Sequence, residues 1–443
     1  MEKQELKKDD LPLYEALQKA SSEYIPGASQ SFVEPIVKAY DIAYVRFACN
    51  DFDMMTDFLN DFGLILAHKD EEVIYSRGLE GNPYCHIVHK GSPKFMGFGL
   101  MMRDEKDLHT LAEKVPGCSP VYDIGGIEGK LGGGKRVHFK CPVSGLLIEA
   151  VHGRTAEELS PTREKIVYNY GGDYDRQGEL QDVANNRENN NEDPGAPEIR
   201  RIAHCVLALP MGAHQQMMKF MHDTFGFIPS DTAFLAAVPE GHNIDVGIAT
   251  NLAAGGPPDK NMSNALAQFM RCDRGEEFTD HHTFLFLPLM DPKADVPGKG
   301  INAQLSHVAF EVQSLDDVWR GHMSLVRRRD KGKRYNLAWG VGRHVLGSQV
   351  YDYWYDPWGH VHEHMVDGDR LKKSWGQRIH NITHLGPNGH NQWGPTVVES
   401  GVRNLDGPQT APYFSELPKE TQLSLIDRDM SDLQEVLDNL NQK

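Results

Sequence analysis

The chain has 443 residues, of which 40% are hydrophobic and 25% are charged, as in ordinary soluble globular proteins. This length predicts two or three domains. The 63 acidic and 46 basic residues leave a net charge of −17, which repels phosphate backbones and anionic lipid surfaces. We therefore expect neither nucleic acid nor a membrane as a partner.

The first residues are charged and lack the apolar stretch of a signal peptide. We expect residues 1–39 to form a helical extension. No apolar run in the chain approaches the length of a membrane span, and the six cysteines are scattered without a C-x-x-C pair. These features predict a soluble, cytoplasmic protein with reduced thiols, and they argue against a disulfide framework or a zinc ribbon.

Two parts of the chain repeat the same order of elements. A strand pattern leads into an amphipathic helical run that ends at Phe-Gly, a second strand leads into an acidic helix start, and a third strand, a Pro-containing turn and a strand with a glutamate follow. Such self-similarity indicates a duplicated structural unit. The matching stretches are 41–64 with 201–227, 96–114 with 306–323, and 137–153 with 353–368.

The repeat predicts two domains, which we place at residues 40–155 and 199–370. A polar, Asn-rich linker at 156–198 separates them, because such a segment cannot bury enough apolar surface to pack. The second copy is longer than the first by about fifty residues ahead of His307. Two Gly-, Pro- and Asn-rich segments look like this insertion, namely 251–268 and 290–304.

Residues 371–443 lie beyond the repeat and form a C-terminal extension. Within it, residues 422–440 place leucines and a methionine at helical spacing. We expect this helix to dock on its own chain or on a sister subunit, and we expect the protein to form homo-oligomers.

The polar residues of the two copies differ in an informative way. Two positions that carry histidines in the second copy carry other residues in the first, whereas a glutamate is present in both. A metal site is therefore expected in the second copy alone, with the first copy as a scaffold. The aligned pairs are Tyr44 with His204, Gly97 with His307, and Glu149 with Glu363.

The segment GHVHEHM offers two incompatible sets of ligands. Successive side chains of a strand point to opposite faces, so His360, His362 and His364 share one face and Glu363 points to the other. Either a His-x-His pair chelates a metal, or Glu363 does with the histidines outside. The repeat favours Glu363, because its first copy retains Glu149 there. An edge strand with solvated histidines is the plainest alternative.

His204 and His307 complete a set of two histidines and one carboxylate with Glu363. Two neutral imidazoles and one carboxylate on one face of a metal ion leave the opposite positions open, as in non-haem Fe(II) oxygenases. Mn(II) accepts the same ligand types, so the sequence predicts Fe(II) with Mn(II) as the alternative.

The chain resembles a known family from Gly342 onward, where it reads GRHVLGSQVYDYWYDPWGHVHE. This segment is similar to the signature of type I extradiol ring-cleavage dioxygenases, with Asp352 as the one departure. The resemblance implies an α+β fold of paired βαβββ modules in two domains, the vicinal-oxygen-chelate fold, whose first domain lacks the metal. The matching residues are Gly342, His344, Tyr353, Asp356, Pro357, Gly359 and Glu363.

The resemblance also implies roles for further residues. The segment FMRCDRGEEFTDHHTFLF resembles the family's strand with the acid/base histidine. His281 and His282 should point to opposite faces of that strand, so we expect one of them in the pocket, and the following residues favour His282. Tyr353 and His344 are the implied hydrogen-bond donors to a catechol-type substrate, which is cleaved with O₂ beside its diol.

Three other functions fit the same features less well. A glyoxalase-like enzyme usually takes metal ligands from both modules, and Tyr44 and Gly97 argue against such a set. A hydroxyphenylpyruvate-type dioxygenase gives no reason for the pair His344 and Tyr353. A non-catalytic protein that binds small aromatic molecules would not need His282.

Overall fold

The computed structural model of the protein describes residues 34–162, 195–210, 213–234, 267–289, 303–381, 391–395, 407–427 and 430–442. The helical extension expected over 1–39 therefore lies outside the described residues, apart from 34–39, none of which is helical. Most of the expected linker and of the two expected insertions also lies outside them.

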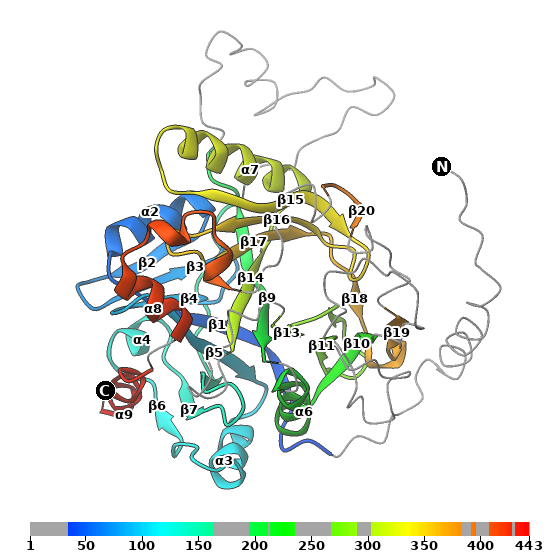
Figure 1. The fold of residues 1–443 in the computed structure, drawn as a ribbon. Coiled ribbons are helices and arrows are strands. Elements are labelled where there is room, and N and C mark those ends of the chain that lie inside the picture. Colours follow the sequence, from blue (N-terminus) through cyan, green and yellow to red (C-terminus); the bar gives the residue numbers. More distant parts are fainter. Residues whose placement is uncertain are drawn as a thin grey trace, which may run out of the picture.

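The structure contains two large sheets with helices outside them (Figure 1). The first module comprises β1 (Ala39–Cys49), α2 (Phe52–Phe62), β2 (Ile65–Lys69), β3 (Val73–Arg77), β4 (His86–Lys90), β5 (Lys94–Met102), α3 (Glu105–Lys114), β6 (Tyr122–Asp123), α4 (Gly126–Leu131), β7 (Lys135–Lys140) and β8 (Leu147–His152). The second module comprises β9 (Ile199–Leu209), α6 (Ala213–Phe225), β10 (Phe227–Phe234), β11 (Ala267–Cys272), β12 (Thr279–Asp280), β13 (Phe284–Pro288), β14 (Gln304–Val312), α7 (Leu315–Asp330), β15 (Asn336–His344), β16 (Val350–Tyr355) and β17 (Val361–Val366).

Each module is built from two βαβββ units. In the first sheet, of order β2-β3-β4-β1-β5-β8-β7-β6, β1 runs parallel to β4 and β5 runs parallel to β8. The two units join through the antiparallel pair of β1 and β5. The second sheet repeats this plan with β9 beside β13 and β14 beside β17, joined through antiparallel β9 and β14. The expected α+β fold of paired βαβββ modules is confirmed.

Local sequence explains where the helices of these units begin and end. The Asp51 side chain accepts a hydrogen bond from the backbone N–H of Met54 and caps α2, which Gly63 ends with a φ of 107°. Ser314 caps α7 in the same way, by accepting from the backbone N–H of Asp317. These caps place α2 and α7 after the central strands of their modules.

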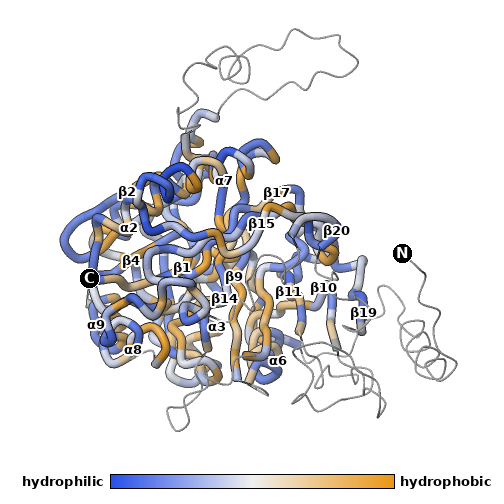
Figure 2. Tube along the Cα trace, turned by 45° about the horizontal axis from the view of Figure 1, so that its top comes forward, coloured by the Kyte–Doolittle hydropathy of each residue, from blue (hydrophilic) through white to orange (hydrophobic). Residues whose placement is uncertain are grey.

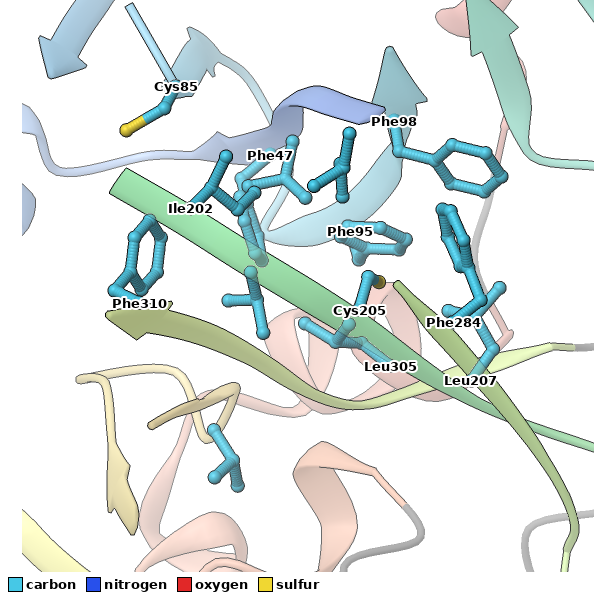
Figure 3. Close-up of a cluster of buried hydrophobic side chains, with 14 of the residues drawn as sticks. Phe47, Cys85, Phe95, Phe98, Ile202, Cys205, Leu207, Phe284, Leu305 and Phe310 are labelled. Carbon is cyan, nitrogen blue, oxygen red and sulfur yellow. The ribbon is translucent and has the colours of Figure 1, made fainter. Parts of the chain in front are cut away.

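The two sheets share one apolar core. Figure 3 shows aromatic side chains of β1 and β5 facing apolar side chains of β9, β13 and β14. Phe98 and Phe284, one from each module, have ring centroids 4.6 Å apart. Figure 2 shows hydrophobic residues along β9 and β14 in the interior and hydrophilic stretches around the outer elements β2 and α9. Burial of apolar side chains from both modules in this common core holds the two modules together.

The C-terminal extension runs back over both modules. It contains β18 (Arg370–Leu371), β19 (Arg378–Asn381), β20 (Asn391–Trp393), α8 (Lys419–Asp427) and α9 (Leu433–Gln442). The prediction of one continuous helix over 422–440 is wrong in that respect, because α8 ends at Asp427 and α9 begins only after the polar pair Ser431 and Asp432. The expected docking on the chain itself is seen, since Leu433 packs against Ala48, Met96 and Leu147 of the first module.

Two simpler expectations concern cysteines and membrane spans. All six cysteines fall within the described residues, and each has a free thiol. In the part of the chain that the structure describes, every helix is too short or too polar to cross a bilayer.

Candidate metal centre

Three neighbouring strands of the second sheet carry His204, His307 and Glu363. His204 on β9 lies opposite Ala309 on β14, and Ala309 lies opposite Glu363 on β17. His204 and Glu363 therefore belong to one row across the sheet, with a methyl side chain between them. His307 lies two residues before Ala309 and so shares its face. The small residue leaves room for the three larger side chains to converge above it.

The three side chains do converge. The Nε2 atom of His204 lies 3.0 Å, and that of His307 3.4 Å, from Oε2 of Glu363, and one ligand atom from each residue lies within 4.8 Å of the others. Among the described residues, this is the single group of histidine, cysteine and carboxylate side chains with such spacing.

The surroundings of Glu363 fit a bound cation. The carboxylate is fully buried, and among the described residues no arginine or lysine pairs with it; its basic neighbours are the imidazoles of His204 and His307. Burying a carboxylate costs free energy unless a positive charge lies beside it. Burial, with the nearby His204 and His344, lowers the pKa of His307 well below its ordinary value, so this imidazole is neutral and keeps a lone pair for a metal. The donor set thus suits Fe(II) or Mn(II).

The histidines beside Glu363 lie on the opposite face, as strand alternation predicts. His362 is buried between the modules, where its Nε2 lies 3.2 Å from Nε2 of His86. His364 stacks on Phe62 with a centroid distance of 3.8 Å. The alternatives of a His-x-His chelate and of solvated histidines are therefore not what the structure shows.

His282 lies beside the three converging residues. Its ring centroid is 4.2 Å from that of His204, and the ring is buried. Burial, with the neighbouring His204, lowers its pKa well below the ordinary value. His281 and His282 are in the loop between β12 and β13, so the strand alternation expected for them does not apply. The two rings differ in their contacts: Nε2 of His281 lies against Asp231 on β10, and Nδ1 of His281 lies 3.0 Å from Nδ1 of His282.

Tyr353 and His344 also lie beside the centre. Tyr353 on β16 pairs directly with Glu363 on β17, and its ring centroid is 4.9 Å from that of His307. The Tyr353 hydroxyl lies 2.9 Å from Nε2 of His344, at the end of β15. Burial and the nearby Glu363 raise the pKa of Tyr353 well above its ordinary value, so the phenol keeps its proton.

The equivalent place in the first module holds an ion network. Tyr44 pairs with Gly99, and a Cβ at Gly99 would lie 2.4 Å from the Tyr44 ring, so the ring lies flat over this glycine. Glu149, opposite Gly99 on the next strand, pairs with the guanidinium groups of Arg46 and Arg136. Positive charge that a metal could supply in the second module is here supplied by two arginines.

The partners of Glu149 were not predicted from the sequence. Both arginines also pair with Glu128 on α4, and all four side chains are buried. Arg46 lies two residues after Tyr44 and hence on the same face of β1, which is the signal that could have revealed it. Asp231, the partner of His281, offered no comparable signal.

Comparisons with known proteins bear on the fold. No protein-family model matches the chain. A Mn(II)-bound glyoxalase from Novosphingobium aromaticivorans is similar in structure, with a TM-score of 0.56 and 21% identity over 85% of this chain and 94% of that one. The 2,3-dioxygenase LapB from Pseudomonas sp. KL28 has a TM-score of 0.53 and 16% identity, over 79% and 99%.

A third structure is the anaerobic substrate complex of homoprotocatechuate 2,3-dioxygenase from Brevibacterium fuscum with 3,4-dihydroxyphenylacetate. Its TM-score is 0.54, with 17% identity over 84% of this chain and 96% of that one. The fold is the vicinal-oxygen-chelate fold. The resemblance to extradiol dioxygenases that the sequence showed is thus confirmed at the level of this fold, which glyoxalases share.

One curated relative supports the resemblance in sequence. Metapyrocatechase 2 from Cupriavidus necator is 34% identical over 100 residues, which is 23% of this chain. The match spans 29% of the length of that relative.

Proposed function

We propose that this vicinal-oxygen-chelate protein is an extradiol dioxygenase that uses Fe(II), with Mn(II) as the alternative metal. It would cleave the ring of a catechol-type substrate beside the vicinal diol, insert both atoms of O₂ and release a semialdehyde-type acid. The observation that carries the proposal is the convergence of His204, His307 and Glu363 next to His282, Tyr353 and His344.

The metal would be held by two neutral imidazoles and one carboxylate. When bound, the ion supplies positive charge that lowers the pKa of a catechol hydroxyl, together with open coordination positions on the side away from the protein ligands. The buried Glu363 carboxylate would gain a compensating positive charge when the ion binds.

His282 is the residue suited to move a proton. Its pKa is lowered, so the ring is neutral at pH 7 and can accept the proton of the second diol hydroxyl at a ring nitrogen. The same ring can return that proton to an oxygen atom of O₂ later in the reaction. The distance of 4.2 Å between its ring centroid and that of His204 supports this role.

Tyr353 and His344 are suited to stabilise negative charge on a substrate oxygen. The Tyr353 phenol keeps its proton and can donate it in a hydrogen bond as the ring carbon becomes a ketone. His344, 2.9 Å from the phenol oxygen, orients this hydroxyl. Both residues lie on β15 and β16, whose pairing in the sheet makes them rigid.

The test is to purify the protein without oxygen, load it with Fe(II) and follow O₂ uptake with substituted catechols. Uptake of one O₂ for each yellow ring-opened product is expected. Resorcinols are the matched control, because their hydroxyl groups are not adjacent and cannot chelate one ion. Isomerisation of a substrate without O₂ uptake would support the glyoxalase-like alternative, and binding without any turnover would support a small-aromatic-binding protein.

A further inference from the structure

Behind His282, on the side away from the metal centre, lies a chain of buried polar residues. Oδ2 of Asp231 is 2.5 Å from Nε2 of His281, and Nδ1 of His281 is 3.0 Å from Nδ1 of His282. The other carboxylate oxygen, Oδ1, is 2.6 Å from Nε2 of His380. Asp231, His281 and His282 are buried, whereas the His380 side chain is 23% exposed.

The chemistry of these groups decides where the hydrogens lie. Burial alone would raise the pKa of Asp231, but hydrogen bonds from His281 and His380 outweigh burial and hold it well below its ordinary value. The ionised carboxylate can only accept, so Nε2 of His281 carries a hydrogen. The two Nδ1 atoms are 3.0 Å apart, so only one hydrogen fits between them. With the His281 hydrogen on Nε2, Nδ1 of His281 is the atom that accepts, and Nδ1–H of His282 is the donor.

Gln349 approaches the same nitrogen. Its carboxamide nitrogen lies 3.4 Å from Nδ1 of His282, while its oxygen has no partner. A carboxamide can present either end, because rotating it by half a turn exchanges oxygen and nitrogen. With the oxygen turned toward His282, the carboxamide gives Nδ1–H of His282 a second acceptor.

The loop that carries His281 is held firmly. The backbone carbonyl oxygen of His281 accepts a hydrogen bond from the Ser230 hydroxyl, and the backbone N–H of His281 donates to the carbonyl oxygen of Asp369 at 2.9 Å. Arg271 in turn donates to the Ser230 hydroxyl at 2.8 Å. Gly347 must lack a side chain, since a Cβ there would come within 2.8 Å of Nδ1 of His281.

We propose that Asp231 and His281 are positioning residues that hold His282 in the tautomer with hydrogen on Nδ1. Nε2 of His282 is then the ring nitrogen left with a lone pair for the diol hydroxyl. This inference rests on the proposed function for its catalytic meaning, but the tautomer itself is a property of the protein alone. A base that has the wrong tautomer cannot accept the proton without first losing one.

The kinetic test uses two substitutions at His281. Asn is the conservative change, because its side-chain oxygen can take the place of Nδ1 and still accept a hydrogen bond from His282. Leu has a similar size but no hydrogen-bond acceptor. His281→Leu should keep its metal and its KM for the catechol within about threefold, and lose about 10²-fold in kcat. His281→Asn should recover about tenfold of that loss.

His380→Leu is the matched control, since it removes the other partner of Asp231 and leaves the hydrogen bond to His281 intact. Its kcat should stay within about threefold of wild type. Equal losses in His281→Asn and His281→Leu, or a wild-type kcat in His281→Leu, would overturn the proposal.

A second measurement does not depend on activity. ¹⁵N-histidine NMR of the metal-free wild-type protein, with His282 assigned from the spectrum of His282→Phe, reports which ring nitrogen carries the hydrogen. We expect hydrogen on Nδ1 and a lone pair on Nε2. Hydrogen on Nε2 would refute the tautomer proposal even if the protein cleaves catechols, and hydrogen on Nδ1 would support it even if no catechol is cleaved.

Discussion

Tyr44 in the first module stands where His204 stands in the second. Each lies on the first strand of its module, and each pairs across the sheet with a small residue, Gly99 or Ala309. The two strands differ at the position two residues further along, where β1 has the charged Arg46 and β9 has the apolar Val206. One fold thus supports an ion network in one module and a candidate metal centre in the other.

This relationship predicts which substitutions remove metal. His204→Ala, His307→Ala and Glu363→Ala should each lower metal affinity by more than about 100-fold, because even residues that only orient metal ligands contribute about 10- to 100-fold. Metal content after dialysis, measured by mass spectrometry, checks the prediction. Tyr44→Ala should keep full metal content, and loss of metal in a folded Tyr44→Ala protein would contradict a single site in the second module.

The position of His282 predicts a different outcome for its substitution. His282→Phe should retain the metal, since the ring is outside the set of three ligands, and should lose about 10²- to 10⁴-fold in turnover, as expected for removal of a general acid or base. Metal content and O₂ uptake of the same preparation separate the two effects. Turnover at the wild-type rate would show that another group moves the proton.

The ion network of the first module predicts a large effect on stability. Glu149→Gln leaves Arg46 and Arg136 with one charged partner instead of two, and removing one member of a buried ion pair costs about 3–5 kcal/mol. Urea unfolding of metal-free protein measures this change. Asp53→Asn is the control, because Asp53 pairs with Lys69 on the surface, where water screens the pair, and its loss of stability should be much smaller. Similar losses in both variants would mean that the buried network contributes little.

The buried histidine between the modules predicts a pH dependence. Burial lowers the pKa of His362 to about 4, from 6.5 in an unfolded chain, so protonation favours unfolding. Above pH 6.5, His362 is neutral in both states and does not lower the free energy of unfolding. As the pH falls from 6.5 toward 4, the free energy of unfolding decreases by about 3 kcal/mol at most. Metal-free His362→Phe should therefore show a weaker loss of unfolding free energy than wild type over this range. Parallel curves for the two proteins would contradict the prediction.

The sequence predicted the architecture of both modules and brought three distant residues into one site. It could do so because strand alternation assigns residues to faces, and because the repeat shows which residues of the two modules occupy equivalent positions. His204, His307 and Glu363 were found in this way, and the structure places them within reach of one ion.

Only the tertiary structure showed which side chains surround these positions. Asp231 and His281 are 50 residues apart, and Arg46 and Glu149 are 103 residues apart, and no repeat pairs them. Their contacts depend on strand order, on register and on the path of a loop. Those features arise when whole sheets assemble, because the burial of apolar surface stabilises the joint packing of many strands. No local pattern of residues predicts them.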